Sequence, residues 1–215
     1  MRFALDDEQV ALRDALDKLV AGNRAAPDLW QRLEELGIND LAAEASAVEV
    51  VVAFEVLGKH AVRDAVASTA GVRDDAELAT LATAAYLLGA GERVLADTVA
   101  YAKQRRQFGR EIGSYQAIKH RLADVRIALD FARPLVHGAA LDMTPRSVSA
   151  AKVGAGDAAY LASRTGLQVH GAIGYTLELE LSTWLTTIRE LQSAHGTAAF
   201  HRRRILDALL AERAG

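Results

Sequence analysis

The chain has 215 residues, of which 51% are hydrophobic and 25% charged, with a formal net charge of −3 at pH 7. This composition is typical of a folded globular protein and excludes a disordered chain. The acidic balance argues against a nucleic-acid partner, and the absence of cysteine excludes disulfides and thiolate chemistry. Without a long apolar run or a signal-peptide pattern, we expect a cytoplasmic protein with no membrane contact.

Helical spacing of apolar residues predicts three helices at the start of the chain. The first covers about residues 5–19, with Asp6 as a plausible N-cap. Pro27 suits the first position of the second helix, which should stop at Gly37. The third helix should run over residues 47–57 and close at Gly58. We expect these helices to form a small N-terminal domain, residues 1–63.

The periodicity breaks between Asp64 and Asp75, and we interpret residues 64–74 as a linker. Beyond it, long periodic segments predict five helices, over about residues 75–105, 114–140, 146–170, 179–192 and 197–213. Ser114 and Pro145 should mark two of the helix starts, and Gly154 and Gly156 would be explained by the close approach of a neighbouring helix. The expected fold is all-α, with an N-terminal helical cluster and a C-terminal antiparallel four-helix-type bundle over residues 75–215.

The segment RRQFGREIGSYQAIKHRLAD carries Arg105, Phe108 and Gln116. A guanidinium offers forked donors to phosphate oxygens, and a carboxamide offers both a donor and an acceptor. Gly109 permits a turn between two helices. Alone, the segment also fits an ordinary helix–loop–helix corner with an exposed arginine.

A second segment, QVHGAIGYTLELELSTWLTTIRELQSAHGT, begins at Gln168 and ends at Thr197. It carries Gly171, Ala172 and Gly174 in a glycine-rich turn, where backbone N–H groups can approach a ligand closely. His195 lies 27 residues after Gln168 and precedes Gly196-Thr197.

At this spacing the two segments resemble the signatures of acyl-CoA dehydrogenases, R-x-x-F-G-x-x-(I/L)-x-x-x-Q and Q-x-x-G-G-x-G-(Y/F)-x-x-E followed by E-G-T. The N-terminal helices and residues 75–215 resemble the family's two helical domains. The resemblance implies that a neighbouring subunit's FAD is held at its pyrophosphate and adenosine half. By position, the residues that would hold it are Arg105, Phe108, Gln116, Gln168, Gly171 and Ala172. Ala172 stands where the family prefers glycine.

The resemblance breaks down at the catalytic base. His195 occupies the position of the family's glutamate, which removes the α-proton of the thioester. A histidine can accept a proton, but its ring has a different reach. Other family members carry the base at a position that aligns near Ala79, where no carboxylate stands. Glu77 lies two residues away, roughly 160–200° around the helix.

The family also carries a β-rich middle domain that holds the flavin ring. Residues 64–74 are too few for a sheet domain. The chain has either lost this domain or represents a shortened form of a longer protein.

These features predict a subunit of a heteromeric FAD-dependent acyl-CoA dehydrogenase of the actinobacterial type, which lends its FAD clamp to a full-length catalytic partner. The expected assembly is a heterotetramer with two copies of each chain, acting on an acyl-CoA, with a steroid side-chain thioester suggested by analogy. Two alternatives stay open: a self-sufficient flavin enzyme with His195 as base, and a flavin-free helical scaffold. The histidines show no metal-binding spacing, so no metal is expected.

Overall fold

The computed structural model describes residues 5–24, 26–35, 37–38, 45–68, 75–171 and 180–214. The prediction of an all-α fold is confirmed, with one two-stranded hairpin added to the helices. The elements are α1 (Asp7–Asn23), α2 (Leu29–Glu35), α4 (Ala47–Lys59), α5 (Arg63–Ser68), α6 (Ala76–Gln104), β1 (Arg106–Gln107), β2 (Arg110–Glu111), a single 3-10 turn (Ile112–Ser114), α7 (Gln116–Asp142), α8 (Pro145–His170), α9 (Ser182–Leu191) and α10 (Ala198–Ala214). None of the helices in the described part of the chain is long and apolar enough to cross a membrane.

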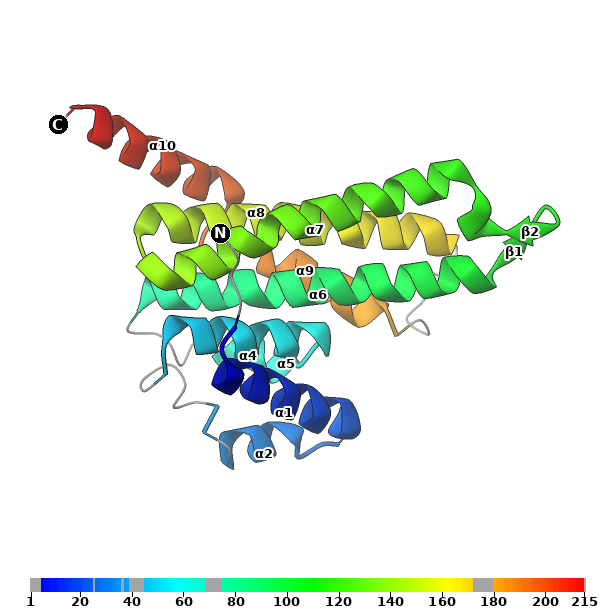
Figure 1. Ribbon diagram of the computed structural model, residues 1–215, viewed down its shortest axis with the longest axis horizontal. Helices are drawn as coiled ribbons and strands as arrows, with labels where there is room; N and C mark the ends of the chain where they lie inside the picture. The colour runs from blue at the N-terminus through cyan, green and yellow to red at the C-terminus, as the bar shows by residue number, and fades with distance from the viewer. Residues whose placement is uncertain are drawn as a thin grey trace.

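Helix α6 lies at the centre of the molecule. In Figure 1, α1, α2 and α4 lie on one side of α6, and α7 and α8 lie on the other. One continuous cluster of buried apolar side chains extends from Leu16 in α1 to Leu191 in α9. The hydrophobic core is therefore shared between the N-terminal helices and the bundle.

Several predicted element boundaries need correction. Residues 64–68, where we expected the linker to begin, belong to α5. Helix α2 begins at Leu29, two residues after Pro27. Helix α4 continues through Gly58 to Lys59. Helix α7 is preceded by Tyr115 as its N-cap, because Ser114 belongs to the 3-10 turn.

Other local predictions are confirmed. Asp6 caps α1 in a capping box with Gln9, and Pro145 occupies the first turn of α8. At Gly154 an added Cβ would lie 2.9 Å from Leu135 Cδ1 of α7, as the predicted close helix approach requires. At Gly156, in contrast, an added Cβ would meet nothing within 4 Å, so helix approach does not explain this glycine.

Helices α4 and α6 touch backbone to backbone at two glycines. A Cβ on Gly58 of α4 would lie 2.0 Å from the carbonyl oxygen of Tyr86 in α6. A Cβ on Gly89 of α6 would lie 1.9 Å from the carbonyl oxygen of Glu55 in α4. Both distances are far inside van der Waals contact, so each helix needs glycine where the other crosses it.

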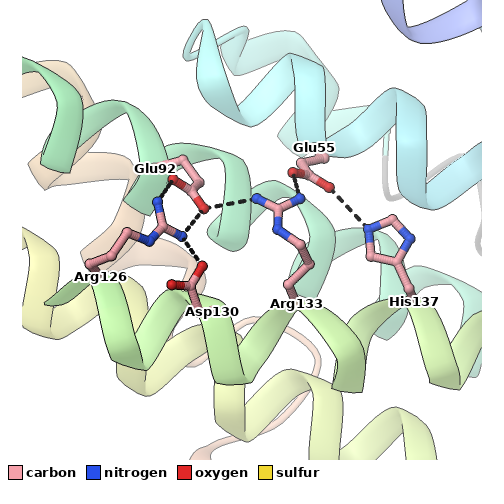
Figure 2. Close-up of polar contacts among 6 residues, drawn as sticks. All are labelled: Glu55, Glu92, Arg126, Asp130, Arg133 and His137. Atoms are coloured by element: carbon pink, nitrogen blue, oxygen red, sulfur yellow. Dashed lines mark hydrogen bonds and ion pairs between the residues drawn. The ribbon is translucent and has the colours of Figure 1, made fainter. Parts of the chain in front are cut away.

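A network of charged side chains then joins this crossing to α7 (Figure 2). Arg133 of α7 donates to Glu55 of α4 at 2.5 Å and to Glu92 of α6 at 2.8 Å. Both terminal nitrogens of Arg126 donate hydrogen bonds to the Glu92 carboxylate at 2.6 Å, and Nε2 of His137 lies 3.3 Å from Oε2 of Glu55. Burial alone would raise the pKa of Glu55, but the bond with His137 and the charge of Arg133 hold it below its ordinary value. Glu55 is therefore ionised at neutral pH and joins α4 to α7, and Arg133 extends the network to Glu92 of α6.

The crossing generates a test of the fold. We expect Gly89→Ala to lower the free energy of unfolding by about 3 kcal/mol or more, because the new methyl group collides with a backbone carbonyl that only a helix shift can relieve. The matched control is Gly156→Ala, where the methyl group has room and the helix gains propensity. It should raise the free energy of unfolding by up to about 1 kcal/mol. Chemical denaturation measures both, and equal effects of the two substitutions would contradict the close crossing.

Candidate functional site

Three helix ends and the hairpin gather at one end of the bundle, where Figure 1 shows the end of α6, strands β1 and β2, the start of α7 and the end of α8. Tyr101 in the last turn of α6 stacks on His170 at the end of α8, with ring centroids 4.2 Å apart. Gly113 packs against α6 so closely that a Cβ there would lie 2.9 Å from the carbonyl oxygen of Ala102. We call this region, which contains the proposed FAD-contacting residues, the clamp end.

Phe108 stands at the tip of the hairpin, where the sequence predicted only a turn at Gly109 between two helices. Strands β1 and β2 pair antiparallel, with Arg106 opposite Glu111 and Gln107 opposite Arg110. Phe108 and Gly109 form the turn, with φ values of 51° and 81°. The Phe108 side chain is 91% exposed. A bulky residue in the left-handed region with its ring in water is costly for this chain alone, which suits a residue that packs against something else.

The hairpin is held in place by residues that the motif did not identify. The Arg110 guanidinium lies 4.0 Å from the centroid of the Tyr115 ring, and the Tyr115 hydroxyl donates to the carbonyl oxygen of Gln107 at 3.2 Å. The signal that could have revealed the hairpin was Gly109 between two short polar segments, because tight hairpin turns favour glycine. These contacts fix the direction in which Phe108 projects.

The other sequence-predicted residues lie on the same end of the molecule. Arg105 is the C-cap of α6, Gln116 is the first residue of α7, and Gln168 lies in the last turn of α8; all three are exposed. Gly171 ends α8 with a φ of 66°, a conformation that favours glycine. Ala172 and Gly174 lie outside the described residues.

The donors at the clamp end fit an anionic ligand such as the ADP half of FAD. Within the described ranges, no carboxylate lies within ion-pair distance of Arg105, and no hydrogen-bond partner occupies the Gln116 side chain. The N-cap of α7, Tyr115, makes no side-chain capping bond. The first N–H groups and the positive end of this 27-residue helix are therefore available to an anion. Arg105, Gln116 and Gln168 would hold the cofactor, with Phe108 packed against it.

The turn that carries His195 lies between α9 and α10, and hydrogen bonds from α8 hold its first residues in place. The buried Lys152 of α8 donates to the carbonyl oxygens of Leu191 and Gln192 at 3.0 and 3.2 Å. These carbonyls end α9, where a cation is favoured. Burial lowers the pKa of Lys152 to about 8.

A buried histidine holds the other side of this turn. His201 is fully buried, with Nε2 at 3.1 Å from the carbonyl oxygen of His195 and Nδ1 at 3.1 Å from Ser149 Oγ. Because a carbonyl can only accept, Nε2 carries the hydrogen, and Nδ1 of the neutral ring accepts from Ser149. Gly196 packs on this ring, with a φ of 116° and room for no Cβ. The turn is thus well ordered by groups that contact its backbone.

The side chain of His195 itself is poorly equipped as a base. It is exposed, and in the described part of the chain its imidazole has no hydrogen-bond partner to orient it. Although the side chain is exposed overall, the atoms that cover part of it, together with the charge of Lys152, lower the pKa of His195 below its ordinary value. An effective catalytic imidazole is normally aligned by a second group, commonly a carboxylate.

The family's other position for the base is also unfilled. Ala79 is buried in α6, and its methyl group has no acid–base chemistry. Glu77, two residues earlier, is bound by Arg204 of α10 at 2.5 Å. Among the residues described, no group of three potential metal ligands is present.

The buried His201 generates a pH prediction. Burial and the nearby Lys152 charge lower the pKa of His201 below its ordinary 6.5, so the unfolded state binds the proton more readily. The free energy of unfolding should therefore fall as the pH drops from about 6.5 towards the folded pKa, with a slope of up to about 1.4 kcal/mol per pH unit from this group. Denaturation midpoints measured across this range should show a smaller slope in His201→Gln, while His120→Gln, at an exposed position on α7, should keep the wild-type slope. An unchanged slope in His201→Gln would contradict the assignment.

Comparison with known proteins places this geometry in a family. Residues 75–210 match the family described as acyl-CoA dehydrogenase, C-terminal domain. Acyl-CoA dehydrogenase IpdE2 of Mycobacterium tuberculosis is 41% identical over 123 residues, which cover 57% of this chain and 37% of that protein. 3-sulfinopropanoyl-CoA desulfinase of Paraburkholderia xenovorans is 33% identical over 151 residues, 68% of this chain and 39% of that protein.

Solved structures agree with the sequence relatives. A variant of the Tcur3481-Tcur3483 steroid ACAD (acyl-CoA dehydrogenase) superposes with a TM-score of 0.63 at 26% identity, over 68% of this chain and 42% of that one. Butyryl-CoA dehydrogenase from Megasphaera elsdenii gives 0.60 at 29% identity, over 68% of this chain and 38% of that one. The chain thus spans about two fifths of the length of the relatives it matches. On the strength of the family match over most of its length, this chain belongs to the acyl-CoA dehydrogenase family.

Proposed function

We propose that the chain is a subunit of a heteromeric FAD-dependent acyl-CoA dehydrogenase, in which it contributes the ADP-side FAD clamp to a catalytic partner chain. The observation that carries this proposal is the clamp end itself. Arg105, Gln116 and the exposed Phe108 project from one end of the bundle without partners among the described residues, at the positions that match the family motif.

The state of the catalytic positions supports a role for a partner chain. Among the described residues, His195 stands in place of the glutamate without an orienting partner, Ala79 offers no base, and Glu77 is bound by Arg204. Only residues 69–75 separate α5 from α6, which is too short for the β-rich domain that holds the flavin ring in the family. A chain that matches the family at its FAD-contacting positions, but whose described residues offer neither the base nor a domain for the flavin ring, fits a partner subunit.

The clamp residues would act by binding and orientation. FAD, when bound, supplies the acceptor for the hydride equivalent that leaves the acyl chain. Arg105 and the N-terminus of α7 would neutralise the pyrophosphate. Gln116 and Gln168 would give hydrogen bonds to the adenosine half, and Phe108 would exclude water from it. The two-part name of the Tcur3481-Tcur3483 steroid ACAD favours an assembly of two different chains and a steroid-type thioester substrate. We propose two copies of each chain.

Flavin content tests the proposal. The chain should be colourless when purified alone and should yield a yellow complex, with a flavin spectrum, when co-expressed with a full-length acyl-CoA dehydrogenase chain that retains the catalytic glutamate, sought first in the adjacent gene. In that complex Arg105→Ala should weaken FAD retention by about tenfold or more, since a charge-assisted contact to phosphate is lost. Lys103→Ala, which removes the same charge from the same helix two residues earlier, should have little effect.

The outcomes separate the three functions that the sequence allows. Strong flavin colour in the isolated chain would contradict the partner role and favour a self-sufficient enzyme. Absence of flavin from every preparation would favour a scaffold. Retention of FAD by Arg105→Ala at the wild-type level would show that the clamp is not used.

His195 gives an independent prediction. If a partner supplies the base, His195→Ala should change the turnover of the complex by no more than about twofold to threefold. Loss of a true general base typically costs about 100-fold to 10,000-fold. Steady-state turnover with an acyl-CoA measures the difference, and a loss in that larger range would assign the base to His195.

A further inference from the structure

A groove between α7 and α8 opens beside the clamp end. It has a volume of about 490 Å³ and is lined by residues that include Arg121, Asp124, Tyr160, Arg164 and Gln168. Gln168 belongs to the proposed clamp, whereas Arg121 matches no position of the family motif. Arg121 lies in α7, five residues after Gln116, so the groove brings a second α7 residue to the clamp.

The contact between Arg121 and Gln168 has a defined direction. Nη1 of Arg121 donates a hydrogen bond to Oε1 of Gln168. A guanidinium has donors only, so the oxygen of the carboxamide must face Arg121 and the amide nitrogen must face away from it. Within the described ranges the amide nitrogen of Gln168 has no acceptor. Its two N–H groups are therefore left to a ligand.

We propose that Arg121 is a positioning residue, which fixes the Gln168 carboxamide so that its N–H donors face the ADP half of FAD. This inference rests on the proposed function. A free glutamine side chain rotates between many conformations, and ordering it on binding costs affinity. Arg121 orders it beforehand, because the planar guanidinium accepts no hydrogen bond and so permits one orientation of the amide.

A double-mutant cycle tests the inference, with FAD as the probe and its retention by the co-purified complex as the readout. Gln168→Met should weaken FAD retention by about tenfold and Arg121→Met by about threefold to tenfold. Because Arg121 acts through Gln168, the double variant should retain FAD as well as Gln168→Met alone. If the two losses instead multiply, Arg121 acts on FAD directly and the inference is wrong.

Three further variants sharpen the result. Gln168→Glu keeps an acceptor for Arg121 but removes the N–H donors, so it should lose FAD at least as strongly as Gln168→Met. Wild-type retention by Gln168→Glu would overturn the inference.

Arg121→Lys should retain more FAD than Arg121→Met but less than the wild type, since lysine keeps a donor without the planar fork. Lys119→Met removes a neighbouring exposed charge from α7 and should leave retention unchanged, and a loss equal to that of Arg121→Met would point to net charge instead.

The design separates failure of the inference from failure of the proposed function. Unchanged FAD retention in both Arg105→Ala and Gln168→Met would overturn the clamp and with it the role of Arg121. Losses in those two variants, with none in Arg121→Met, would overturn only the positioning role. Thermal midpoints close to that of the wild type in each variant show that the fold is retained.

Discussion

The contact between the backbones of α4 and α6 is the constraint on which the rest of the molecule depends. Gly58 and Gly89 let each helix present a carbonyl to the other at a distance that no side chain would allow. The same crossing places Glu55 beside Glu92, and Arg133 of α7 bridges both carboxylates. Two residues after Gly89, Gly91 packs against Leu129 of α7 and Ala159 of α8. The glycines of α6 thus let α4, α7 and α8 all pack closely against this one helix.

This central helix connects the crossing to the clamp end. Helix α6 runs for 29 residues and ends at the hairpin that displays Phe108. Its last turn is tied to the end of α8 by the stacking of Tyr101 on His170. The exposed clamp residues therefore stand on helices whose relative positions are set by close packing in the core. In the function that we propose, this support favours FAD binding, because the clamp residues need little further ordering when the cofactor binds.

The long helices could be predicted from the sequence because their signal is local: apolar periodicity, Asp6 and Pro145 all act within a few residues. Gly58 was misread as a helix stop, because the reason for that glycine lies on another helix. The N-cap of α7 was predicted at Ser114 but lies at Tyr115 for a similar reason, since the hairpin and the 3-10 turn that follows it set where α7 begins. The motif predicts Arg105, Phe108, Gln116 and Gln168 as FAD contacts, and this stays a prediction. The contact of Arg121 with Gln168 could not be predicted, because it arises only where α7 and α8 lie side by side.

The central claim is that this chain touches FAD whose flavin ring is held by a partner. Photolabelling of the complex with an azidoadenine analogue of FAD tests it most directly, since the label attaches to whichever chain lies against the adenine. Digestion and mass spectrometry should find the label on this chain, in peptides that contain Phe108, Gln116 or Gln168. Labelling confined to the partner chain, in a complex that holds a full complement of flavin, would contradict the account.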